Sequence, residues 1–444
     1  MRTEWLRRML SCGRMMERWI AGRAAMAVVI AACACVSFNP AIAQDAKAPV
    51  TPSAPAGKPD APAKPEGKPE GKPDAKPEAG AEAKPAPLPA PDADVAKLNV
   101  LIERMTRAVL ATDIAGYMAC VDKADPVFLQ EQKNWAKDLE RKPVEEFSIK
   151  AESFRAENEG EIIADLTMNW KIKDGGAARF LRYAGRFVDR KGEWLYAGEH
   201  WKVMEREGVR VFFDAGRENI ATMICEIMPD IRKHVHEGFA LTIGRVQEIK
   251  LYSSMAHLQQ SIYLSYTDGL SGWNEPDESI KMIASAHPDK EGMTSVLAHE
   301  YGHVCTFELG PRANDAPWWV LEGVAELSSE SYDDNGQFAL RAVRRMAKNG
   351  RLRDWASLSD FHNTKQADMQ MVYTQGHAML GYISERFGRE KRIAWLKAMA
   401  TGSSIDDASR AIFDLSFAEL DAQWRESLKP KEEAPAPAET PSKE

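Results

Sequence analysis

A proline-rich, low-complexity segment limits which parts of this 444-residue chain can fold. Residues 44–97 hold 13 of the 25 prolines and repeat K-P-E, G-K-P-E and G-K-P-D, with Leu88 almost the only large aliphatic side chain. Such a segment buries too little apolar surface to offset its chain entropy, and proline keeps it extended. We therefore expect a disordered Pro/Lys/Glu/Ala-rich linker at residues 44–94. The same composition predicts a disordered tail at residues 430–444.

The residues before the linker have the pattern of an export signal. Six arginines in residues 2–23 precede the apolar stretch A-A-M-A-V-V-I-A-A-C-A-C-V, and Ala41 and Ala43 then form a small-x-small cleavage site. We expect a signal peptide at residues 1–43. Two alternatives remain, a lipobox ending at Cys33, which would then be lipidated, and an uncleaved signal anchor. All three interpretations predict an exported protein, periplasmic or extracellular, with a membrane anchor only at its N-terminus.

Charge and hydropathy exclude two classes of protein. The net charge of −8 argues against a nucleic-acid partner, which normally requires a clustered basic face. No apolar run after the N-terminus approaches the roughly 20 residues that a membrane-spanning helix needs. Outside the leader only Cys120, Cys225 and Cys305 remain, and we expect them to be buried apolar side chains, with a single disulfide as the alternative.

Residues 95–205 are expected to form an α+β accessory domain. Apolar side chains recur at helical spacing over residues 95–109, and helices are also expected at 115–121 and 127–139. The period then changes to two, which predicts strands at 147–151, 164–172, 179–188 and 193–203. Helices followed by a curled antiparallel sheet resemble the cone-shaped nuclear-transport-factor-2-like (SnoaL-like) fold. Because no acid/base cluster is present, we interpret Glu199 and His200 as a surface or capping pair.

Residues 206–429 carry the candidate chemistry on a mixed set of elements. Strands are expected at 209–214, 248–252 and 279–284, and helices at 218–236, 255–263 and 290–309. The remainder predicts a helical C-terminal subdomain, with Trp395 and Trp424 in its core and a capping box made by Ser416 and Glu419. The fold class expected for the whole chain is therefore α+β.

The expected helix at 290–309 contains the motif H-E-Y-G-H, with His299, Glu300 and His303. Residues four apart on a helix are rotated by only about 40°, so the two imidazoles point the same way and can bind one metal ion. Glu300 is turned aside by about 100° and can reach a water molecule at the metal. Zinc suits such ligands and lowers the pKa of its water to about 7, and Glu300 would act as the general base and then the acid.

A third ligand candidate follows 18 residues after His303. Glu322 lies in W-V-L-E-G-V-A-E, and Pro317 suits the first position of a helix that carries it. Glu326, one helical turn later, shares its face and can accept a hydrogen bond from the free N–H of a ligand histidine. The motif, the spacing and the second acid together predict one zinc ion per chain.

This combination resembles the gluzincin metallopeptidases, with the spacing of the aminopeptidase-N-like group and the E-G-x-A-E sequence of smaller peptidase-MA-like families. The resemblance covers about 209–428 and implies a zincin-type α+β domain. It implies that His299, His303 and Glu322 bind zinc, that Glu300 is the general base, and that Glu326 orients a ligand. It also implies an edge strand within 272–284 that pairs with the substrate backbone.

The chain departs from the large aminopeptidases, since it has neither their N-terminal saddle domain nor a G-x-M-E-N motif. We therefore expect an endopeptidase acting on a peptide or protein. Related peptidases stabilise the oxyanion with a Tyr or His after the third ligand, for which Tyr373 is the candidate and His377 the second choice. Two other functions remain open, a non-catalytic zinc-containing scaffold of the cell envelope and a hydrolase of cell-wall peptide cross-links. The oligomeric state is not predicted.

Overall fold

The computed structural model describes residues 88–284 and 289–429. The expected signal peptide, nearly all of the linker and the tail lie outside these residues. Within the described part the fold is mixed α+β, as expected, with an N-terminal sheet and a helical C-terminal region. Regular structure starts at β1 (Leu88–Pro89) and α2 (Asp92–Leu110), earlier than the expected boundary at residue 95. Pro91 is the N-cap of α2, and Asp92 and Asp94 in its first turn favour a helix start there.

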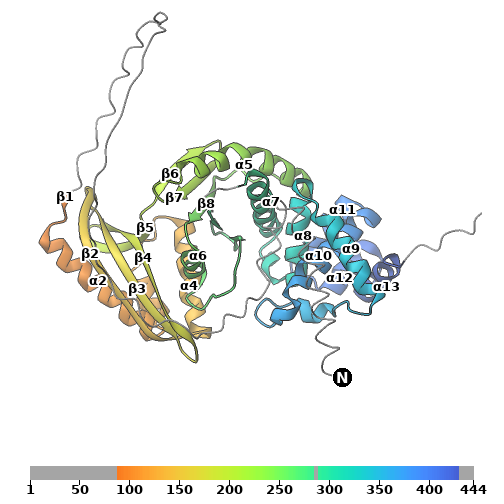
Figure 1. The fold of residues 1–444 in the computed structure, drawn as a ribbon, viewed down its shortest axis with the longest axis horizontal. Helices are drawn as coiled ribbons and strands as arrows, with labels where there is room; N and C mark the ends of the chain where they lie inside the picture. The colour runs from red at the N-terminus through yellow and green to blue at the C-terminus, as the bar shows by residue number, and fades with distance from the viewer. Residues whose placement is uncertain (1–87, 285–288, 430–444) are drawn as a thin grey trace, which may run out of the picture. The chain divides into compact units, whose positions relative to one another are not determined.

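The first sheet is antiparallel and open, with the order β1-β2-β3-β4-β5. Its longer strands are β2 (Val144–Asn158), β3 (Glu161–Ile172), β4 (Gly175–Arg190) and β5 (Glu193–Glu199). Register shifts between β2 and β3 bend the sheet, and α2 runs alongside it (Figure 1). The helices α3 (Ile114–Met118) and α4 (Pro126–Arg141) complete this region. The nuclear-transport-factor-2-like resemblance stays a prediction.

One expected strand is wrong. Residues 193–203 do not form a single strand, because β5 ends at Glu199 and β6 (Lys202–Arg206) pairs with β7 (Val209–Phe213) in a second sheet. The alternating pattern continues across this change of sheet, so the sequence does not reveal it. The interpretation of Glu199 as a surface group is also wrong, since its carboxylate lies 2.7 Å from Nε2 of the buried His257.

The second sheet is mixed and has the order β6-β7-β8-β10-β9. The parallel strands β7, β8 (Gln247–Tyr252) and β10 (Ile280–Ile283) form its centre, and β9 (Gly272–Trp273) is an antiparallel edge strand. The helices α5 (Glu218–Phe239) and α7 (Lys290–Phe307) share one apolar core with this sheet, and α6 (Met255–Ile262) precedes β9. An edge strand therefore lies where the resemblance places one.

The C-terminal region is helical. It consists of α8 (Trp318–Ser329), α9 (Asn335–Lys348), α10 (Met369–Phe387), α11 (Arg389–Ala400), α12 (Ile405–Phe413) and α13 (Phe417–Ser427). Trp395 and Trp424 are fully buried, and Ser416 and Glu419 form the expected capping box. The backbones of α8 and α10 approach closely, since a Cβ on Gly323 would lie 2.6 Å from the backbone of Gly376. Small residues at this crossing bring the polar side chains of the two helices together.

The described cysteines Cys120, Cys225 and Cys305 are free and buried, as expected, so the alternative of a disulfide among them does not hold. Burial raises the pKa of the Cys305 thiol to about 12. Among residues 88–284 and 289–429, no helix is long and apolar enough to cross a lipid bilayer.

Candidate metal and catalytic site

The two histidines of the H-E-Y-G-H motif lie on one face of α7. Asp289 caps this helix by accepting hydrogen bonds from the backbone N–H groups of Glu291 and Gly292. Much of the helix surface is buried in the main core, and the face that carries His299 and His303 is turned toward α8. Their rings form an edge-on pair with centroids 5.0 Å apart. The helical spacing thus brings both imidazoles to one point.

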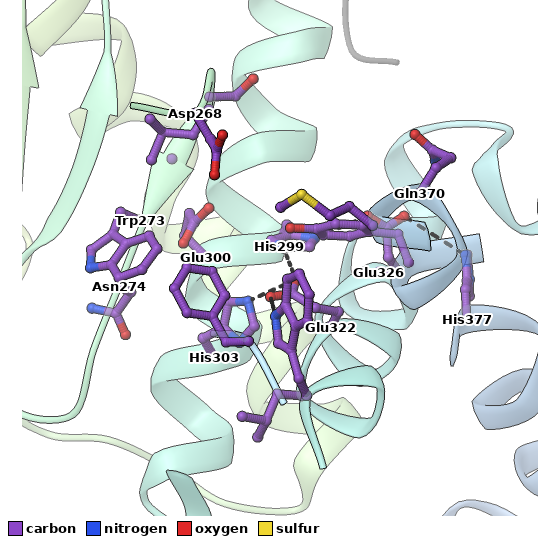
Figure 2. Close-up of a pocket in the computed structure, with 18 of the residues that line it drawn as sticks. Asp268, Trp273, Asn274, His299, Glu300, His303, Glu322, Glu326, Gln370 and His377 are labelled. Atoms are coloured by element: carbon purple, nitrogen blue, oxygen red, sulfur yellow. Dashed lines mark hydrogen bonds and ion pairs between the residues drawn. The ribbon is translucent and has the colours of Figure 1, made fainter. Parts of the chain in front are cut away.

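Glu322 on α8 completes a group of three ligand atoms within 4.8 Å of one another. Its Oε2 lies 3.3 Å from His299 Nε2 and 3.5 Å from His303 Nε2 (Figure 2). Pro317 is the N-cap of α8 and not its first residue, so Glu322 lies on the second turn of the helix. Two imidazoles and one carboxylate in this arrangement match the ligands of a catalytic zinc site with an open fourth position.

Trp318 fixes the direction of the Glu322 carboxylate. Its indole nitrogen donates a hydrogen bond of 2.7 Å to Glu322 Oε1, which leaves Oε2 facing the histidines. Burial alone would raise the pKa of Glu322, but the two histidines hold it far below the ordinary value. Burial would likewise lower the pKa of His299, but hydrogen bonds to Glu322 and Glu326 raise it well above the ordinary value. The carboxylates of Glu322 and Glu326 thus stabilise positive charge on His299.

Glu300 is buried and lies beside the edge strand β9. In Figure 2 its carboxylate points toward the side of the pocket that holds Trp273 and not toward Glu322. A Cβ at Gly272 would lie 2.4 Å from Glu300 Oε1, so any larger residue at this point of β9 would force the carboxylate to move. Burial raises the pKa of Glu300 above the ordinary value of a carboxyl group.

Glu326 links His299 to a third histidine. Its Oε1 lies 3.4 Å from His299 Nδ1, the ring nitrogen turned away from Glu322, and its Oε2 lies 3.8 Å from His377 Nδ1. The other ring nitrogen of His377 lies 3.7 Å from Glu330 Oε2. Glu326 thus contacts the ring nitrogen of His299 that does not face Glu322, and its expected role in orienting a ligand histidine stays a prediction.

The two oxyanion candidates differ in position. Figure 2 shows His377 on the far side of Glu326 from His299, so it does not face the three ligand atoms directly. Tyr373 lines the same cavity, with its ring centroid 6.4 Å from that of His299 and 6.1 Å from that of Trp318. Burial raises the pKa of Tyr373 well above its ordinary value, so its hydroxyl remains a proton donor. Of the two, Tyr373 is the better placed.

All of these groups line one cavity of about 570 Å³. Its walls are the loop before β9, β9 itself, α7, α8, α9 and the start of α10. Trp318 and Gly272 were not among the expected residues of the site. The i, i+4 spacing of Trp318 and Glu322 is visible in the sequence, whereas the contact of Gly272 with Glu300 depends on the tertiary fold.

Residues 232–430 match the model of the Peptidase MA superfamily. The match covers α7, α8 and α10 and therefore all three ligand candidates. No curated protein shows significant sequence similarity to the chain. The superfamily is typically zinc-dependent, and the match supports a metallopeptidase-like hydrolase in this part of the chain.

Proposed function

We propose that this chain is an exported zinc-dependent metallopeptidase that hydrolyses peptide bonds. The observation that carries the proposal is the convergence of His299, His303 and Glu322 within 4.8 Å, beside the buried carboxylate of Glu300. When bound there, zinc would act as a Lewis acid toward the peptide carbonyl and lower the pKa of a water molecule. Export is proposed from the arginine-rich leader and its small-x-small cleavage site.

Glu300 carries the proton transfers in this proposal. Its carboxylate accepts one proton from the attacking water while the water oxygen forms a bond to the carbonyl carbon. It then gives that proton to the nitrogen of the leaving amine as the C–N bond breaks, so the carboxylate is regenerated. Tyr373 donates a hydrogen bond to the oxygen on which negative charge develops.

The edge strand β9 would align the substrate. Its free edge offers backbone N–H and C=O groups along the cavity, and an extended peptide can pair with them as an added strand. We propose an endopeptidase, since the sequence lacks the G-x-M-E-N motif that the large aminopeptidases use for a free amino terminus.

The test combines metal content with peptide cleavage by the full mature chain. We expect one zinc ion per chain and cleavage of a diverse peptide mixture, with cleavage lost in Glu300→Gln and zinc retained. Glu291→Gln is the matched control, because Glu291 is an exposed carboxylate on the same helix. Absence of zinc, or unchanged cleavage by Glu300→Gln, would refute the proposal.

Two results would favour the other functions. Zinc binding without cleavage of any peptide would favour a non-catalytic scaffold of the cell envelope. Cleavage of cell-wall fragments without cleavage of casein would favour a hydrolase of wall cross-links.

A further inference from the structure

A second cavity adjoins the candidate active site. Its volume is about 520 Å³, and it shares part of its lining with the first cavity, including Tyr263, Tyr266 and Asp268 from the loop between α6 and β9. Phe361 and His362 on the opposite side also line both. A peptide leaving the edge strand along this loop would therefore pass from the first cavity into the second.

The far wall of the second cavity comes from the accessory region. It is formed by the β3–β4 hairpin, at Gly175, Gly176, Ala177 and Arg179, and by the end of α4, at Arg141 and Lys142. Ala177 and Arg179 line the cavity whereas Ala178 does not, as expected for alternating side chains on a strand. The cavity thus joins the N-terminal sheet to the candidate site.

This wall is attached to the α6–β9 loop by hydrogen bonds. Arg179 donates at 2.7 Å to the backbone carbonyl of Tyr266 and at 2.7 Å to Gln259 Oε1. The indole of Trp170 donates at 3.0 Å to the carbonyl of Leu264. Because strand and loop share these bonds, the wall has a fixed position relative to the loop that continues into β9.

The second cavity is lined by an excess of positive charge. Arg141, Lys142 and Arg179 line it, and Asp268 is the single acid among the described residues of the lining. Arg141 pairs with Asp138 outside the cavity. The two groups that accept hydrogen bonds from Arg179, the Tyr266 carbonyl and the Gln259 amide oxygen, are both uncharged and do not neutralise its guanidinium. A ligand segment with carboxylates would find complementary charge.

We propose that the second cavity binds the part of an extended peptide substrate that lies beyond the residues next to the scissile bond, and that it prefers acidic segments. This inference rests on the proposed peptidase function and names the substrate class of that site. It gives the accessory region a role in substrate selection. Long acidic peptides are then better substrates than short peptides that contain the same cleaved bond.

The first experiment measures cleavage with matched peptides. The substrates are a short peptide that is cleaved, the same peptide with an acidic extension at either end, and the same extensions with the acids replaced by Gln. Ala177→Trp fills the cavity, and Ala178→Trp, on the other face of the same strand, is the control. We expect Ala177→Trp to lower the ratio of kcat/KM for the acidic long peptide to that for the short peptide about tenfold, which corresponds to about 1.4 kcal/mol.

The role of positive charge in the second cavity is tested with the variant Lys142→Glu. Lys137→Glu is its control. Both lysines are exposed near the end of α4, but only Lys142 lines the cavity. We expect Lys142→Glu to abolish the preference for the acidic over the Gln extension, mainly through KM. Equal effects of each variant and its control would overturn the inference and leave the peptidase proposal intact.

A binding measurement separates the two proposals. The labelled acidic long peptide is titrated into the full mature chain carrying Glu300→Gln, and anisotropy reports binding without cleavage. If Ala177→Trp in this background weakens binding and Ala178→Trp does not, the second cavity binds the acidic segment, and this result stands apart from whether wild type cleaves the test peptides. Equal binding of the acidic long peptide by the Ala177→Trp and Ala178→Trp variants would overturn the inference, whatever the cleavage assay shows.

Discussion

The indole N–H of Trp318 and the carboxylate of Glu322 are joined by a hydrogen bond within a single helix, one turn apart on α8. Both side chains are buried, so water cannot easily replace this bond. It occupies Oε1 and leaves Oε2 facing His299 and His303, where the proposed zinc ion would bind. The direction of the Glu322 carboxylate is thus set by a residue that would not itself touch the metal.

Trp318→Phe keeps the ring packing and removes the donor. We expect zinc affinity to fall about 10- to 100-fold, because the Glu322 carboxylate can then rotate. Competition with a chelator measures the zinc affinity. Trp194→Phe is the control, since its indole also donates to a carboxylate, that of Asp94, in the accessory region. Unchanged zinc affinity in Trp318→Phe would show that the Glu322 carboxylate keeps its direction without the hydrogen bond from Trp318.

Gly272→Ala tests the contact between β9 and the general base. The new methyl group would overlap Glu300 Oε1 and Cδ, so the carboxylate must move. We expect kcat to fall about 100-fold with zinc content unchanged, since a displacement of roughly 1 Å at a reacting group has this effect. Gly244→Ala is the control, because nothing lies within 4 Å of a Cβ there. Full activity of Gly272→Ala would place the base elsewhere.

Tyr373→Phe removes the candidate oxyanion donor. We expect kcat to fall about 100- to 1,000-fold with little change in KM, because this bond strengthens only as charge develops. Tyr382→Phe on the same helix is the control, since Tyr382 packs against the core and does not line the cavity. A kcat for Tyr373→Phe within twofold of wild type would remove Tyr373 from the mechanism, and His377→Gln would then be measured.

Local patterns predicted most of the helices and strands in the described residues, although α9 was not among the expected helices. The i, i+4 rule placed His299 and His303 together because that spacing is a property of one helix. Glu322 was identified by its spacing and by a family resemblance, and the close approach of α8 and α7 then brings it to the histidines.

Contacts that depend on tertiary structure were not predictable. The change of sheet after Glu199 and the ion pair of Glu199 with His257 leave no local signature. The same holds for Gly272, whose role follows from the position of β9 beside Glu300. Sequence periodicity reports which face of an element is buried, but it does not report the partner of that face.

A pH-dependent stability is expected from Glu275, a partly buried carboxylate beside β9. Burial and the neighbouring Glu278 raise the pKa of Glu275 from 4.5 to about 7, although Tyr263 and Lys281 act in the opposite direction. The folded state therefore holds this proton more tightly than the unfolded state. Its contribution to stability is fully present below about pH 4.5 and is lost as the pH rises through about 7.

Glu275→Gln removes this titration. We expect the free energy of unfolding of wild type, relative to Glu275→Gln, to fall by up to about 3 kcal/mol between pH 4.5 and pH 8. Urea unfolding followed by circular dichroism at several pH values measures the difference. Glu193→Gln, which makes the same replacement at an exposed carboxylate, is the control. A constant difference between wild type and Glu275→Gln across this range would mean that Asn134, which donates a hydrogen bond to Glu275, keeps this carboxylate ionised in the folded state.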